Sequence, residues 1–151
     1  MSREHQYCIT TTWTGNRGTG TSDYKTYARD HEIFAAGKGA PLAGSSDAGF
    51  RGDGSRYNPE ELLVASLSAC HMLWFLHLAC QKKYVVDRYV DEAVGVLDKT
   101  WMSRVTLRPA VSFSGKAPST EEHAELHHRA HEKCYIANSV KTEVVVEPCL
   151  K

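Results

Sequence analysis

The sequence predicts an α+β fold in which two helices are inserted between runs of antiparallel strands. Residues 7–14 alternate between apolar and polar positions as a strand does, two later segments carry helix-start signals, and strand-like alternation returns between and after them. Strict strand–helix alternation is absent, which argues against a parallel α/β sheet. The length of 151 residues fits one globular domain, so we expect residues 1–151 to form a single domain.

The N-terminal third is expected to be strands and loops. Tyr7 to Thr14 is a β-branched run that ends at Gly15, and it predicts a first strand followed by a turn. A second strand is expected from Thr19 to Ala28. The stretch from Gly37 to Gly54 is rich in Gly, Ala, Ser and Asp and has no period, so we expect a long loop there.

The first helix has clear start signals. Asn58 fits the N-cap, Pro59 the first helical position, and Glu61, three residues after the cap, closes a capping-box-like pair, so a helix to about Lys82 is predicted. Beyond it the pattern predicts two strands, a second helix that opens with the capping box of residues 119–122, and a last strand. Their expected ranges are Val85–Leu97, Trp101–Phe113, 119 to about 134 for the helix, and Val140–Glu147.

Composition and charge exclude several function classes. Eighteen basic and eighteen acidic residues cancel, so no overall field would attract nucleic acid or an anionic membrane surface. The N-terminus lacks the apolar stretch of a signal peptide, and we expect a cytoplasmic protein. The five cysteines are odd in number and contain no C-x-x-C pair, which favours core thiols or redox chemistry over a disulfide framework or a zinc ribbon.

The run from Leu62 to Cys80 contains no Asp, Glu, Lys or Arg over 19 residues. Such a run is just long enough to cross a bilayer, but two serines, two histidines and soluble-type strands around it favour a helix buried in a protein core. A single sheet with one solvent-exposed face leaves too few residues to bury the helix on all sides. We therefore expect a homodimer in which two copies of the helix pack together.

Cys70 lies in the middle of this run and has two interpretations. Free cysteine is often a small buried hydrophobe, whereas a reactive thiol needs a positive group nearby and a second thiol to resolve its sulfenic acid. Cys134 is the best second thiol by position. Cys80 is about 15 Å further along the same helix and cannot bridge to Cys70 without unwinding it.

The stretch "NPEELLVASLSAC", together with the later "HEKCYIANSV", closely resembles the OsmC/Ohr family of osmotically induced and organic hydroperoxide resistance proteins, from about Tyr7 to Val146. The resemblance implies antiparallel sheets wrapped around two long central helices in an intertwined homodimer. It also implies a thiol peroxidase that acts on organic hydroperoxides and needs a dithiol reductant such as a lipoyl protein, with no cofactor and no resident metal.

The resemblance further implies a role for each site residue. Cys70 resembles the peroxidatic cysteine, Cys134 the resolving cysteine, and Glu60 the carboxylate that holds an arginine over the thiolate. That arginine is Arg17 or Arg51, with Arg56 as a weaker third candidate, and the competing interpretation is an ordinary exposed arginine. Because Glu60 and Cys70 are about 15 Å apart along one straight helix, we expect Glu60 to serve the site of the partner chain.

Neighbouring residues leave alternatives open. Leu67, Met72 and Trp74 would favour apolar peroxides over hydrogen peroxide, although each also fits simple core packing.

His123, His127 and His131 recur on one helix face, a spacing that can chelate zinc or nickel. No acidic third ligand is evident, however, and a solvated or partly packed face is expected. His71, beside Cys70, fits a core histidine or a proton-transfer group. A non-enzymatic metal-binding protein and a ligand-binding dimer with structural thiols therefore remain alternatives to the peroxidase.

Overall fold

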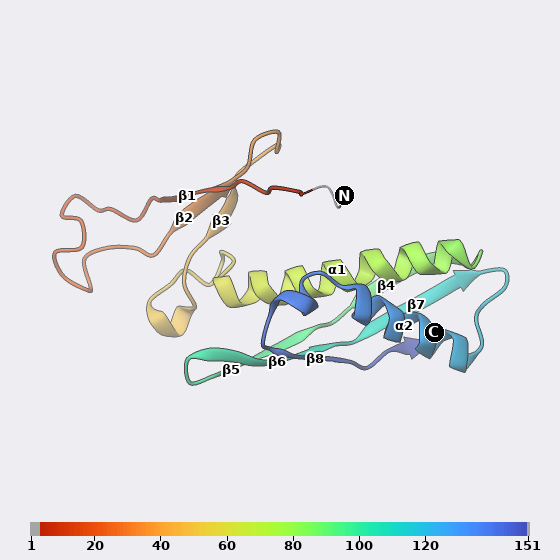
Figure 1. Ribbon diagram of the computed structural model, residues 1–151. Coiled ribbons are helices and arrows are strands. Elements are labelled where there is room, and N and C mark those ends of the chain that lie inside the picture. The colour runs from red at the N-terminus through yellow and green to blue at the C-terminus, as the bar shows by residue number, and fades with distance from the viewer. Residues whose placement is uncertain (1–3, 151) are drawn as a thin grey trace. The chain divides into compact units, whose positions relative to one another are not determined.

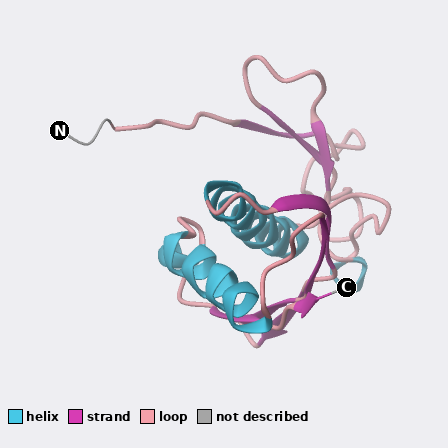
Figure 2. Ribbon diagram, turned by 90° about the vertical axis from the view of Figure 1, so that its right-hand side faces the viewer, coloured by secondary structure: helices cyan, strands magenta, loops and turns pink. Residues whose placement is uncertain are grey.

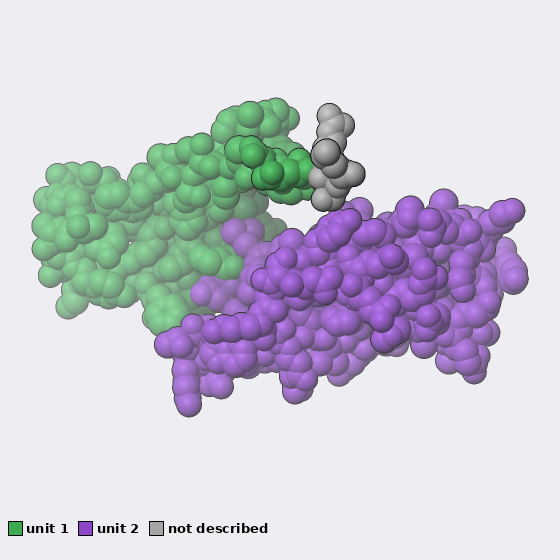
Figure 3. Space-filling model, viewed as in Figure 1, with its two compact units in different colours: residues 1–59 green, residues 60–151 purple. Residues whose placement is uncertain are grey.

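The computed structural model describes residues 4–150, which form two compact units. Unit 1 covers residues 1–59 and unit 2 covers residues 60–151 (Figure 3). The single domain expected from the chain length stays a prediction.

Unit 1 is built on a small antiparallel sheet (Figure 1). Its strands are β1 (Thr10–Trp13), β2 (His31–Phe34) and β3 (Leu42–Gly44), in the order β1-β2-β3. The predicted first strand is confirmed, but in a shorter form. The predicted loop over residues 37–54 contains β3 and a short 3-10 helix, η1 (Ala48–Phe50).

The strand predicted from Thr19 to Ala28 is wrong, because that segment forms turns. The Asn16 side chain accepts hydrogen bonds from the backbone N–H groups of Gly18 and Gly20, at 2.9 and 3.0 Å. The Asp23 side chain accepts another from the N–H of Lys25 at 2.8 Å. These local bonds satisfy the donors that a strand ladder would have used.

Unit 2 contains both helices. The first, α1 (Pro59–Gln81), confirms the predicted helix within one residue at its end, and the second, α2 (Thr120–Lys133), confirms the helix expected from its capping box. The N–H of Glu122 donates to the Ser119 hydroxyl at 3.1 Å, and the N–H of Ser119 donates to the Glu122 carboxylate at 3.0 Å. Both halves of the capping box are therefore formed.

The strands of unit 2 make two mixed sheets, β4-β7-β9 and β5-β6-β8. In each sheet the first pair is antiparallel, whereas the last strand joins in parallel. Each of the two long strands predicted before α2 is in fact two strands, the last predicted strand is shorter, and the final strand was not predicted. The observed ranges are β4 (Val85–Asp91), β5 (Val94–Asp98), β6 (Trp101–Leu107), β7 (Pro109–Ser114), β8 (Glu143–Val146) and β9 (Cys149–Leu150).

The two long strands break at neighbouring positions, where Asp91 pairs with Pro109. Pro109 has no N–H to donate to a ladder. The Asp91 carboxylate accepts a hydrogen bond from the N–H of Arg108 at 2.6 Å and another from the Ser68 hydroxyl of α1. The Asp91 side chain thus replaces backbone pairing at the bend and links the bend to α1 through Ser68.

Two clusters of buried apolar residues form the core, and both lie in unit 2. The first joins α1, α2 and β7 through residues that include Phe75, Leu126 and Val111. The second joins α1 to β6 through Leu67, Val105 and Leu107. Figure 2 shows the two helices side by side, which is the arrangement that the first cluster stabilises.

One face of α1 is apolar and exposed. Ala65, Ala69 and Leu73 lie one turn apart along it, and Leu73 is 62% exposed. Among the described residues α1 is the one helix long and apolar enough to cross a membrane, which is weak evidence because core helices of soluble proteins have the same length and composition. The complete burial expected for this helix is therefore not reached within one chain.

Candidate thiol site

The structure brings Cys70 and Cys134 together. Cys70 is half-buried in the middle of α1, and Cys134 is the fully buried C-cap residue of α2. The two thiols are close enough for Cys70 to raise the pKa of Cys134, and neither is part of a disulfide. Two free sulfur atoms from helices that are far apart in the sequence thus share one site.

The environment of Cys134 keeps it as a thiol. Burial, with a smaller contribution from the neighbouring Cys70, raises the pKa of Cys134 to about 11, although the N–H of Ala137 partly opposes this by donating to the sulfur at 3.4 Å. A thiol with such a pKa is protonated at neutral pH. Because Cys134 is buried, Cys70 is the sulfur that an incoming reagent can reach.

Cys70 opens onto a cavity of 320 Å³ with a mainly apolar wall. The cavity is lined by Cys70, Leu73, Trp74, His77 and Tyr135. The first four follow the i, i+3, i+4, i+7 spacing of one helix face. That spacing is visible in the sequence and could have predicted most of the lining.

Aromatic groups form the wall of this cavity. The Trp74 ring meets the rings of His77 and Tyr135 edge to face, at 5.7 and 5.6 Å between centroids. The Lys133 ammonium lies 5.5 Å from the Trp74 ring centre, within the range of a cation–π contact. Of the apolar neighbours expected beside Cys70, Trp74 lines the cavity, whereas Leu67 belongs to the core and Met72 is not part of the lining.

A second cluster, of histidines, lies in the core on another face of α1. The Nε2 atom of His71 and the Nδ1 atom of His127 are 2.9 Å apart, and the two rings are coplanar. Phe75 stacks on His127 at 4.2 Å between centroids, and His123 meets the same ring edge to face. His71 is therefore a core residue, and its side chain does not take part in the cavity at Cys70.

Burial keeps these histidines neutral. It lowers the pKa of His71 to about 4, with a smaller contribution from His131, and it lowers the pKa of His127 to about 3, with smaller contributions from His71 and His123. The helix face expected to be solvated or partly packed is packed at His123 and His127. Among residues 4–150 no three His, Cys, Asp or Glu side chains are arranged to hold a metal ion.

Glu60 lies in the first turn of α1, where a carboxylate interacts favourably with the positive end of the helix. Ten residues of this continuous helix separate it from Cys70, which amounts to about 15 Å of rise. Within one chain Glu60 is thus distant from the pair of thiols.

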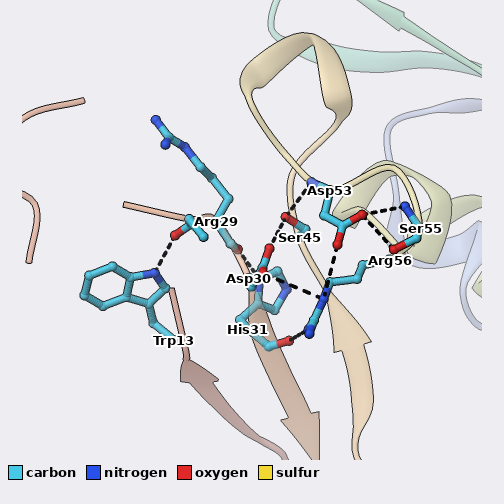
Figure 4. A network of polar contacts seen from close by, with 9 residues as sticks. Trp13, Arg29, Asp30, His31, Ser45, Asp53, Ser55 and Arg56 are labelled. Atoms are coloured by element: carbon cyan, nitrogen blue, oxygen red, sulfur yellow. Dashed lines mark hydrogen bonds and ion pairs between the residues drawn. The ribbon is translucent and has the colours of Figure 1, made fainter. Parts of the chain in front are cut away.

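The three candidate arginines belong to unit 1. Arg17 and Arg51 line the same polar cavity of 460 Å³. Arg56 lies between two carboxylates, 3.9 Å from Asp30 and 3.8 Å from Asp53 (Figure 4). Arg56 thus has a structural role in this unit, whereas Arg17 and Arg51 are not paired with any carboxylate among residues 4–150.

Comparison with known proteins identifies the family. The family model described as OsmC-like protein matches residues 52–148, which include Cys70, Cys134 and Glu60 but neither Arg17 nor Arg51. A solved OsmC-like protein of unknown function from Vibrio cholerae is 36% identical, with a TM-score of 0.90 over 97% of this chain and 100% of that one. A search among curated proteins gave no match.

More distant solved structures share the fold. The organic hydroperoxide resistance protein of Elizabethkingia anophelis is 18% identical, with a TM-score of 0.66 over 99% of each chain. The organic hydroperoxide resistance protein OhrB of Bacillus subtilis is 21% identical, with a TM-score of 0.61 over 96% of this chain and 98% of that one. The resemblance drawn from the sequence is thereby confirmed: the chain belongs to the OsmC-like family.

Proposed function

We propose that this protein is a thiol-dependent peroxidase that reduces organic hydroperoxides. The observation that carries the proposal is the pair of neighbouring free thiols, with accessible Cys70 facing an apolar cavity and Cys134 buried close to it. The presence of organic hydroperoxide resistance proteins among the structural neighbours supports the same chemistry.

The reaction uses each thiol in turn. The Cys70 thiolate attacks the terminal oxygen of the hydroperoxide, the O–O bond breaks, and the alkoxide leaves and takes up a proton as an alcohol. Cys70 becomes a sulfenic acid, which condenses with the Cys134 thiol to form a disulfide and release water. An external dithiol, such as a lipoyl protein, then reduces this disulfide and is itself oxidised.

The cavity determines which peroxides are reduced. Its mainly apolar wall gains free energy from burying a hydrocarbon group and gives hydrogen peroxide no such gain. Trp74 has the largest ring of the lining, so we expect it to contribute to the preference for apolar and aryl hydroperoxides.

A homodimer completes the proposed site. The exposed apolar face of α1 at Ala65, Ala69 and Leu73 is suited to pack against the same face of a second copy. In such a dimer Glu60 of the partner subunit would hold the activating arginine, Arg17 or Arg51, near Cys70. The guanidinium would stabilise both the thiolate and the developing alkoxide.

The decisive test is to titrate the fully reduced protein with cumene hydroperoxide and to map the products by mass spectrometry. We expect one equivalent to link Cys70 to Cys134, and turnover to continue with dithiothreitol as reductant. Cys70→Ser should abolish turnover, and Cys134→Ser should consume one equivalent and stop at the sulfenic acid. Cys80→Ser is the matched control, since Cys80 is exposed on the same helix, and it should behave as the wild type. A Cys70 that stays reduced in excess peroxide would contradict the proposal.

A further inference from the structure

Unit 1 contains a polar cavity of 460 Å³ whose lining includes neither Cys70 nor Cys134. Three segments that are distant in the sequence form it: the turn after β1, the segment before β2, and the residues that follow η1. Its charged lining residues are Arg17, Lys25, Arg29, Arg51, Asp30 and Asp53. Four cations thus face two carboxylates around one polar space.

The two carboxylates are already neutralised by other partners. Asp30 accepts a hydrogen bond from the Ser45 hydroxyl at 3.0 Å, and Asp53 accepts two from Ser55, which lower the pKa of Asp53. Arg56 lies within ion-pair distance of both carboxylates, and Figure 4 shows it between them. Among residues 4–59, the cations of the cavity are therefore left without a carboxylate partner.

The cationic groups are held in place by local contacts. The Arg29 guanidinium lies 4.3 Å from the Tyr24 ring centre and 4.1 Å from that of Tyr27, and it donates to the backbone carbonyls of the same two residues at 2.9 and 2.6 Å. It points away from the Asp30 carboxylate (Figure 4). The Arg51 guanidinium lies 6.0 Å from the centre of the same Tyr24 ring, at the outer limit of a cation–π contact. Tyr24 thus holds Arg29 and lies beside Arg51.

The backbone that bears Arg17 and Arg51 is fixed as well. The Asn16 side chain accepts the N–H groups of Gly18 and Gly20 and so closes the turn around Arg17. Asp47 caps η1 by accepting the N–H of Gly49 at 2.7 Å, and Arg51 follows with a left-handed backbone at φ +64°. A left-handed conformation at a residue other than glycine is unfavourable and is found preferentially at functional sites.

We propose that this cavity binds a phosphate-type oxyanion. A guanidinium presents a planar fork of donors that matches the oxygens of a phosphate or carboxylate in bidentate geometry, and Arg17 and Arg51 supply two such forks. Lys25 adds a third cation without a carboxylate partner, which favours a dianion over a monoanion. This inference goes beyond the proposed peroxidase activity, since it needs neither Cys70 nor a peroxide.

The test is isothermal titration calorimetry of the full chain with inorganic phosphate, at fixed ionic strength with chloride as the replaced anion. We expect saturable binding of one phosphate per chain. Acetate at the same ionic strength should bind about 10-fold more weakly, as expected when one charge-assisted contact is lost. Equal affinity for the two anions would overturn the assignment to phosphate, and the absence of saturable heat would overturn the site.

Matched variants locate the site. Arg17→Gln and Arg51→Gly should each weaken phosphate binding by about 10- to 100-fold, the range expected for loss of one charge-assisted hydrogen-bonded partner. Glycine readily adopts the backbone conformation of Arg51, so that variant keeps the local fold. Arg104→Ala is the control, because Arg104 is an equally exposed arginine paired with Glu143 in unit 2. Equal losses in all three variants would show non-specific attraction and overturn the proposal.

One further variant separates this inference from the peroxidase. Cys70→Ser should bind phosphate with wild-type affinity, because Cys70 is not part of the cavity. If phosphate binds but peroxide is not consumed, only the peroxidase proposal fails. If peroxide is consumed but phosphate does not bind, only the oxyanion site fails.

Discussion

The two units of this chain are stabilised in opposite ways. Unit 2 contains both clusters of fully buried apolar residues, and its central side chain, Phe75, has no exposed surface. Unit 1 has neither cluster, and its aromatic residues are largely exposed, with Phe34 at 44% and Phe50 at 56%. Turn hydrogen bonds and the pairing of Arg56 with Asp30 and Asp53 stabilise unit 1 instead.

This difference separates two kinds of chemistry. The thiols lie at the edge of a packed core, where burial fixes their distance and raises the pKa of Cys134. The arginines lie on exposed polar loops, where few apolar contacts hold the backbone. Segments with few buried contacts open at low free-energy cost. We therefore expect unit 2 to determine global stability and unit 1 to be the more adaptable part.

The largest effect is expected when a phenylalanine is replaced by alanine in unit 2 and the result is compared with the same kind of replacement in unit 1. Phe75→Ala should lower the free energy of unfolding by about 3–5 kcal/mol, because it leaves a cavity between α1 and α2. Phe50→Ala in unit 1 should cost less than about 1 kcal/mol, since the ring is already exposed. Urea unfolding followed by far-UV circular dichroism measures both values.

An equal cost for the two phenylalanine variants would contradict the comparison. A cost for Phe50→Ala that grows with protein concentration would sharpen it instead. Such a result would show that a second copy of the chain covers unit 1.

The second prediction concerns the histidines in the core of unit 2. His71 and His127 have folded-state pKa values of about 4 and about 3, below the usual value of 6.5. As pH falls below about 6.5, the unfolded chain binds protons that the folded chain does not, so the free energy of unfolding decreases toward acid pH. Above about pH 6.5 the contribution of these histidines to stability is fully present. Each such histidine should contribute a slope of about 1.4 kcal/mol per pH unit.

Urea unfolding between pH 5 and pH 7 tests this slope. His127→Gln should reduce the slope by about 1.4 kcal/mol per pH unit, which corresponds to one proton. His128→Gln, at an exposed position of the same helix, should leave the slope unchanged. His123, which faces His127, and His131, which faces His71, are the neighbouring titratable groups. Equal stability at pH 5 and pH 7 would show that the cluster is not buried in solution.

The smallest effect is expected at two left-handed residues. Lys99 joins β5 to β6 with φ +55°, and Arg51 follows η1 with φ +64°. Lys99→Gly should raise the free energy of unfolding by about 0.5–1 kcal/mol, because glycine adopts this conformation without strain. Arg51→Gly should leave the main transition unchanged if unit 2 alone determines it. Differential scanning calorimetry measures both, and a stabilisation by Arg51→Gly as large as that by Lys99→Gly would show that the two units unfold together.

Elements with local signals were predictable from the sequence. The N-cap and proline at residues 58 and 59 predicted α1, and the capping box of residues 119–122 predicted α2, because these signals satisfy backbone donors within one turn. The strand expected from Thr19 to Ala28 failed because Asn16 and Asp23 compete for backbone donors. Alternation alone also concealed the breaks in the two long strands, since the bend at Pro109 depends on a contact with Asp91 from the neighbouring strand.

The candidate site was predictable in part. The family resemblance pointed to Cys70 and Cys134, and the structure places them in contact. The spacing of Leu73, Trp74 and His77 after Cys70 is a further signal in the sequence, because it places all four residues on one helix face. Tyr135 was not foreseen as part of the cavity wall, because only the packing of α2 against α1 brings it to Trp74.

The sequence by itself determined the two helices, the family and the residues able to do redox chemistry, because capping, periodicity and thiol identity are local properties. Only the tertiary structure decided which thiol is buried and which is accessible, that His71 is hydrogen-bonded to His127 away from the cavity, and that Arg17 and Arg51 share one space. Those properties depend on burial and on contacts between distant segments. A pKa or a cavity is set by what surrounds a side chain, which chain order does not specify.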